Sequence, residues 1–194
     1  LGMVPYFYED YIYNKDVEIF VQDPYRQTSH ITKKLHLVQT WCNMVGVPYN
    51  NEPTEITYNF REKEAGVGIL ENIIPQNGKP LLIFQPFGGP GKDHQPHPYS
   101  WTRDLHPAQA QAVVDKLKHD YNILHICYEF HPVLNDCIRY HDVISKKELF
   151  SMMYWSQKRL LIDSSLQHAA AAMGLSSTVL WVATQPELFG YPLH

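Results

Sequence analysis

The chain has 194 residues, of which 44% are hydrophobic, and a formal net charge of -4 at pH 7. This composition supports a packed core, excludes a disordered protein and offers no basic block that would favour nucleic acid. Cys42, Cys127 and Cys137 match neither a zinc motif nor a disulfide framework, which favours a reducing compartment. No apolar run approaches the roughly 18 residues of a membrane span, and the first residues lack the pattern of a signal peptide.

The beginning of the chain predicts an edge strand, a helix and a connector. Residues 1–22 combine aromatic side chains with one apolar run, Val17–Val21, which favours a strand. Apolar residues three and four positions apart then predict a single amphipathic helix over residues 28–46, with Gly46 at its C-terminal end. The connector that follows is expected to hold one strand, near Ile56–Phe60.

Residues 76–194 alternate between short apolar runs and helical patterns. The expected strands cover residues 79–85, 122–130, 159–163 and 178–183, and the expected helices cover residues 107–120, 145–157 and 164–174. Such alternation predicts an α/β fold, with a Rossmann-like parallel sheet that carries helices on both faces. Ligands of such sheets bind outside the carboxyl ends of the strands.

The loop after the first of these strands contains Gly88, Gly89 and Lys92. Glycine lets the backbone approach a ligand closely, and lysine supplies a cation. The spacing is neither that of a P-loop nor that of a dinucleotide-binding fingerprint, so an ordinary surface loop explains it equally well when it is taken alone.

Three histidines in this part of the chain, His94, His97 and His106, could be considered as metal ligands. Prolines interrupt the segment repeatedly, and the histidines do not have the spacing of a known metal site. No metal is therefore expected.

Two further features fall at strand ends. A carboxylate such as Glu129 can accept hydrogen bonds from ribose hydroxyls, although a solvated acid explains it equally well. Asp163, Ser164 and Ser165 lie where the next strand meets a helix, whose free N–H groups and dipole favour an anion. His168 can face the same place, or it can donate to a neighbouring carbonyl. Together the three strand-end features favour a diphosphate site.

The second half of the sequence resembles the C-terminal, donor-binding half of glycosyltransferase family 9, the ADP-heptose:lipopolysaccharide heptosyltransferase type of the GT-B fold. The resemblance covers about residues 79–194 and is carried by LLIFQPFGG with Lys92, by Glu129, by DSSLQHAAAAMG and by STVLWVATQPELFGY. Two positions depart from the family pattern. Pro86-Phe87 replaces small hydroxyl residues, and Ser165 stands where glycine is common, so the nucleotide and the sugar stay open.

The resemblance implies roles for the residues at the strand ends. Gly88, Gly89 and Lys92 would hold the donor phosphates, Glu129 would contact the nucleoside sugar, and the group from Asp163 to His168 would bind the diphosphate and the donor sugar. The chain would need no metal or cofactor. Its substrates would be a nucleotide-diphosphate sugar, with an ADP-sugar favoured, and a glycan or lipid-linked glycan acceptor. A cytoplasmic location, including the inner face of the membrane, is expected.

The resemblance also sets the expected domains and the alternatives. Residues 1–75 would be the tail of an acceptor-type domain with the linker helix 28–46, and residues 76–194 would be a nucleotide-sugar-binding domain. The catalytic base is expected in an N-terminal half that the sequence lacks, since neither of the early acids, Glu9 and Asp10, is a good candidate for that role. A non-catalytic nucleotide-sugar-binding or interaction module is the main alternative, and a nucleotide-sugar epimerase of similar fold is another.

Overall fold

The computed structural model describes residues 23–88, 102–141 and 145–194. The chain divides into two compact units, residues 1–49 and 50–194, and each is described by itself. The boundary between the units therefore follows Tyr49, and the assignment of residues 1–75 to an acceptor-type domain stays a prediction. Among the described residues, no helix is both long enough and apolar enough to cross a membrane.

The described part of the first unit contains three short helices. They are η2 (Pro24–Arg26), α2 (Thr28–Ile31) and α3 (Leu37–Met44). The prediction of one helix over residues 28–46 is wrong, because the chain leaves the helix after α2 and Lys33 takes a left-handed φ of 58°. His36 then caps α3, with its Nδ1 accepting a hydrogen bond from the Val38 N–H at 3.2 Å. Gly46 ends α3 with a φ of 68°, as predicted. The strand predicted at Val17–Val21 lies outside the described residues.

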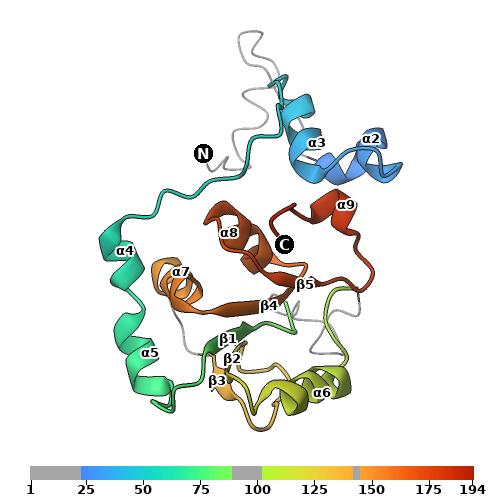
Figure 1. The fold of residues 1–194 in the computed structure, drawn as a ribbon. Coiled ribbons are helices and arrows are strands. Elements are labelled where there is room, and N and C mark those ends of the chain that lie inside the picture. Colours follow the sequence, from blue (N-terminus) through green and yellow to red (C-terminus); the bar gives the residue numbers. More distant parts are fainter. Residues whose placement is uncertain (1–22, 89–101, 142–144) are drawn as a thin grey trace, which may run out of the picture. The chain divides into compact units, whose positions relative to one another are not determined.

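The second unit is built on a five-stranded parallel sheet, which confirms the predicted fold class (Figure 1). The strands are β1 (Leu81–Phe84), β2 (Asn122–Ile126), β3 (Ile138–Tyr140), β4 (Lys158–Ile162) and β5 (Thr178–Leu180). Their order across the sheet is β3-β2-β1-β4-β5. The chain thus moves outward from β1 to β3 and then returns to the other side of β1, which reverses the strand order between β1 and β4.

Helices cover both faces of this sheet, as Figure 1 shows. Leu81 and Ile83 of β1 pack into the core under α7 (Lys146–Trp155) and α8 (Ser165–Ala172). Leu82 and Phe84 point to the opposite face, where they pack with α6 (Pro107–Leu117). All four side chains of β1 are buried, which explains why its sequence is a continuous apolar run rather than an alternating one.

Four elements of the second unit were not predicted. They are β3, α4 (Phe60–Glu64), α5 (Val67–Ile73) and α9 (Pro186–Phe189). The strand predicted near Ile56–Phe60 is wrong. Ile56 donates one backbone hydrogen bond to the Ala172 carbonyl at 2.9 Å, but a capping box between Asn59 and Glu62 then starts α4. β3 is only three residues long and half-buried, so its sequence carries little strand signal.

His125 is fully enclosed on the α6 face of the sheet. His125 is 0% exposed, and its ring centroid lies 6.3 Å from that of Phe84 and 5.7 Å from that of Phe87. Neither ring nitrogen has a hydrogen-bond partner among the described residues. Burial, reinforced by the charges of His131 and Arg139, lowers the pKa of His125 to about 3. The imidazole is therefore neutral in the folded protein at neutral pH.

This buried histidine predicts a loss of stability in mild acid. Between about pH 6.5 and pH 3 the unfolded chain protonates His125 and the folded chain does not, so stability falls as the pH falls through this window. When the pH falls from about 7.5 to 5, the unfolding free energy of His125→Leu should fall by about 2 kcal/mol less than that of the parent protein. Urea unfolding at both pH values measures this, with His119→Leu at an exposed position as the control. Equal losses in the parent and in His125→Leu would contradict the prediction.

Candidate functional site

The strand order reverses between β1 and β4, and parallel sheets bind ligands in a crevice outside the carboxyl ends of the strands at such a point. Residues 85–88 follow β1, and residues 163–165 follow β4 and lead into α8. A methyl group added at Gly88 would lie 3.4 Å from Cδ1 of Ile162, the last residue of β4. The structure therefore places Gly88 beside the end of β4, the strand that Asp163, Ser164 and Ser165 follow.

Ser164 joins the two strand ends. Its Oγ accepts a hydrogen bond from the Leu166 N–H at 3.3 Å, which caps α8, and donates to Oε1 of Gln85 at 2.6 Å. Both side chains are buried. The Ser164 hydroxyl is thus used by the fold, and what it contributes to a ligand site is the position of the helix.

Ser165, at the same helix end, is not used by the fold in this way. Its side chain is exposed, and its N–H makes no hydrogen bond to another described residue. A free N–H in the first turn of a helix, together with the positive end of the helix dipole, favours an anion. Ser165 is therefore the residue of this turn best placed to meet a ligand.

Asp163 is buried beside the first turn of α8. Its Oδ1 accepts a hydrogen bond from Nε2 of Gln167 at 3.3 Å, and Gln167 is itself fully buried. A carboxylate at a helix N-terminus is also stabilised by the helix dipole. The observed contact gives Asp163 a part in ordering α8.

His168 is half-buried in the first turn of α8. Its Nδ1 lies 2.8 Å from the hydroxyl oxygen of Tyr191, and the two rings meet edge to face with centroids 5.5 Å apart. The sequence offered a neighbouring carbonyl as one possible partner of His168. It did not indicate Tyr191, because that residue lies in a segment that returns to α8 only in the folded chain.

Arg103, which the sequence analysis missed, lies beside the end of β1. The N–H of Gly88 donates to Oδ1 of the buried Asp104 at 2.9 Å, which holds the segment before α6 against the strand end. Arg103 comes with it, and its Cζ lies 3.9 Å from a methyl group added at Gly88. The half-buried guanidinium makes no hydrogen bond or ion pair with another described residue. In the sequence, the feature that could have indicated a role for Arg103 was its position just before the start of a helix.

Of the remaining predicted residues, the structure describes Glu129 and His106. Glu129 is exposed in the turn after β2, on the side of β1 away from β4, and its carbonyl accepts a hydrogen bond from Arg139. Gly89 and Lys92 lie outside the described residues, as do His94 and His97. His106 caps α6 through its Nδ1. Within the described ranges, no group of three His, Cys, Asp or Glu side chains could hold a metal ion.

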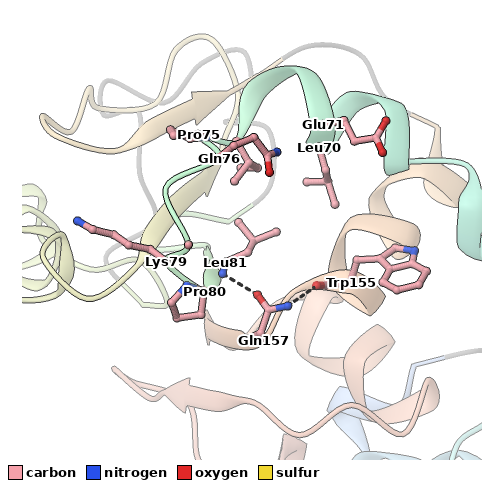
Figure 2. A pocket seen from close by; sticks show the side chains of 11 residues that line it. Leu70, Glu71, Pro75, Gln76, Lys79, Pro80, Leu81, Trp155 and Gln157 are labelled. Atoms are coloured by element: carbon pink, nitrogen blue, oxygen red, sulfur yellow. Dashed lines mark hydrogen bonds between the residues drawn. The ribbon is translucent and has the colours of Figure 1, made fainter.

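A hollow of about 490 Å³ lies at the opposite, amino end of β1 (Figure 2). It is lined by α5, by the segment that leads into β1 and by Trp155 and Gln157. Gln157 accepts a hydrogen bond from the Leu81 N–H at 2.7 Å and donates to the Trp155 carbonyl at 3.1 Å. The amide of Gln157 is thus used in hydrogen bonds within the fold. Parallel sheets bind ligands outside the carboxyl ends of their strands, at the opposite end of β1. The crevice is therefore the better candidate.

Solved structures that share this architecture include two glycosyltransferases. The glycosyl transferase family 9 structure from Veillonella parvula matches with a TM-score of 0.59 at 13% identity, over 89% of this chain and 49% of its own. The ADP-heptose LPS heptosyltransferase II of E. coli matches with a TM-score of 0.55 at 13% identity, over 77% of this chain and 46% of its own. The chain shares its fold with about half of each of these structures.

At this level of identity, the likeness shows the fold alone and confirms the resemblance at that level. The chain spans about half the length of the solved structures it matches. No model of a known protein family matches the sequence, and no curated protein matches it either. The activity, substrates and partners of the family 9 fold therefore come to this chain as proposals.

The contrast between the two serines of α8 predicts different stability effects. Ser164→Ala removes the helix cap and leaves the buried side-chain oxygen Oε1 of Gln85 without this partner, which should lower the unfolding free energy by about 1–3 kcal/mol. Ser165→Ala changes an exposed side chain and should stay within about 0.5 kcal/mol. Urea unfolding of both variants measures the difference. Equal losses would show that Ser164 does not hold the crevice together.

Proposed function

We propose that this chain supplies the donor site of a glycosyltransferase, which moves a hexosyl or heptosyl group from a nucleotide-diphosphate sugar to a glycan or lipopolysaccharide-type acceptor. The observation that carries the proposal is the reversal of strand order between β1 and β4, at whose carboxyl ends α8 begins, in a chain that shares its fold with about half of a family 9 structure. One solved structure of this fold is named for ADP-heptose, which favours an ADP-sugar.

The charges around the crevice suit a diphosphate. The N-terminus of α8 presents the exposed hydroxyl of Ser165 and its N–H, which no other described residue binds, and the segment before α6 presents the guanidinium of Arg103 beside Gly88. Guanidinium binds phosphate oxygens through two parallel hydrogen bonds, and a helix N-terminus adds a dipole of the same sign. The backbone at Gly88 lacks a side chain that would keep a ligand away from Arg103.

The proposed reaction is a direct displacement at the anomeric carbon. The acceptor oxygen forms a bond to that carbon while the bond to the distal phosphate breaks, and its electron pair leaves with the nucleoside diphosphate. The acceptor proton goes to a base, which is expected from the N-terminal half of such an enzyme. Arg103 and α8 would stabilise the charge that develops on the departing diphosphate, so neither a metal nor a cofactor enters the proposal.

A binding module without turnover is the alternative, and the half-length match to the solved structures favours keeping it. The two readings predict the same nucleotide binding and differ in the transfer of sugar. A transfer assay with an ADP-sugar, run on this chain and on a version extended by the family's N-terminal half, separates them. Transfer by the extended version supports the enzyme, and binding without transfer in both supports the module.

Isothermal titration of the purified chain with ADP, GDP, UDP and CMP, without added metal, tests the proposed site. ADP should bind, and Arg103→Ala should weaken its binding by about 10- to 100-fold, because a charge-assisted bidentate contact is lost. Arg61→Ala, at an exposed position of α4, is the matched control and should bind ADP as the parent does. If no nucleotide binds, or if Arg103→Ala binds ADP unchanged, the proposed site is wrong.

A further inference from the structure

We propose that Tyr128 and Phe130 form an aromatic shelf, a surface on which the base of a bound nucleotide stacks. The proposal rests on the proposed function for the presence of that nucleotide, whose diphosphate would lie at the ends of β1 and β4. Both residues belong to the turn that follows β2, and they stand on either side of Glu129 in the sequence.

The two rings of the aromatic shelf are arranged as a stack that solvent reaches. Their planes are nearly parallel, at an angle of 5°, and their centroids lie 5.5 Å apart. Tyr128 and Phe130 are each 46% exposed, so the fold leaves a flat apolar area uncovered at this strand end. A further flat ring can extend an offset stack of this kind.

The turn that carries the aromatic shelf is held by several hydrogen bonds. The His131 N–H donates to the Tyr128 carbonyl at 3.1 Å, and Nδ1 of His131 accepts from the Tyr128 N–H at 3.1 Å. From β3, Nη2 of Arg139 donates to the carbonyls of Tyr128 and Glu129. The same nitrogen reaches the His131 carbonyl at 3.4 Å. A turn fixed in this way needs little further ordering when a ligand binds.

His131 connects the aromatic shelf to the segment that follows β1. Its ring meets the rings of Tyr128 and Phe130 edge to face, with centroid distances of 5.4 Å and 4.8 Å. The same imidazole packs against Phe87, with centroids 5.5 Å apart. Phe87 directly precedes Gly88. The aromatic shelf is therefore joined by direct contacts to the segment that borders the proposed diphosphate site.

The spacing of the strands suits a nucleotide that extends from α8 to the aromatic shelf. β2 and β4 flank β1, and neighbouring strands lie about 4.8 Å apart, so the ends of β2 and β4 are roughly 10 Å apart. A nucleoside diphosphate has about this length. With its phosphates near Ser165, its base would reach the turn after β2, where the exposed carboxylate of Glu129 is available to ribose hydroxyls.

Stacking on the aromatic shelf would add affinity without selecting one base. Every nucleobase has a flat π-face, and stacking on an aromatic side chain needs no hydrogen bond to the edge of the base. The shelf would therefore hold a purine or a pyrimidine, and other groups would decide between them.

Calorimetric titration with ADP and with pyrophosphate, which lacks the nucleoside, tests the aromatic shelf. Replacing both rings in the double variant Tyr128→Leu, Phe130→Leu should weaken ADP binding by about five- to 100-fold, because a stacked base is lost. Pyrophosphate binding should stay unchanged. Tyr128→Phe keeps both flat rings, and Phe60→Leu removes an exposed ring on α4, so both controls should bind ADP as the parent does. Unchanged ADP affinity in the double variant, or equal weakening of both ligands, would overturn the proposal.

Adenosine, which carries no phosphate, separates the aromatic shelf from the proposed function. At millimolar concentration it should move the ring ¹H signals of Tyr128 and Phe130 upfield, through the ring current of the stacked base, and leave those of Phe60 unchanged. If the parent binds neither ADP nor pyrophosphate, the proposed diphosphate site fails, and these shifts would still support the shelf. Absence of the shifts would overturn the shelf even where pyrophosphate binds.

Discussion

The central strand β1 is the part of the structure on which the site depends. It is hydrogen-bonded to β2 on one edge and to β4 on the other, and both of its faces are buried under helices. The chain leaves β1 toward β2 and returns to it at β4, so the connections at its carboxyl end diverge, and sheets of this kind bind ligands in a crevice at that point. Because β1 is fixed on every side, residues 85–88, which follow it directly, start from a firmly held position.

Two hydrogen bonds hold neighbouring segments to the end of β1. Ser164 binds Gln85 and so ties the start of α8 to the end of β1, and Asp104 binds the Gly88 N–H and so ties the segment before α6 to the same place. The groups that remain for a ligand are therefore mounted on fixed supports. Ser165 and Arg103 are the two such groups that the described residues supply. Electrostatic stabilisation of a leaving diphosphate needs this kind of preorganisation.

The sequence predicted what local patterns encode. The apolar run KPLLIFQ indicated a doubly buried strand, the alternation of strands and helices indicated the parallel sheet, and Ser164 was placed at the start of a helix. It did not predict that Arg103 would lie beside Gly88 or that Tyr191 would reach His168, because both contacts form only when distant segments return to the sheet. The helix expected over residues 28–46 failed for a related reason. Apolar spacing continues across the break at Lys33, so periodicity alone could not reveal it.

The most direct test of the account is to map ADP onto the structure by the amide shifts of ¹⁵N-labelled protein. The crevice and the hollow of Figure 2 lie at opposite ends of β1, so a bound nucleotide perturbs one set of amides or the other. The account predicts that the shifts concentrate at Gly88, Arg103 and Ser165. Shifts concentrated at Glu71 and Trp155 would place the ligand in the hollow and contradict it.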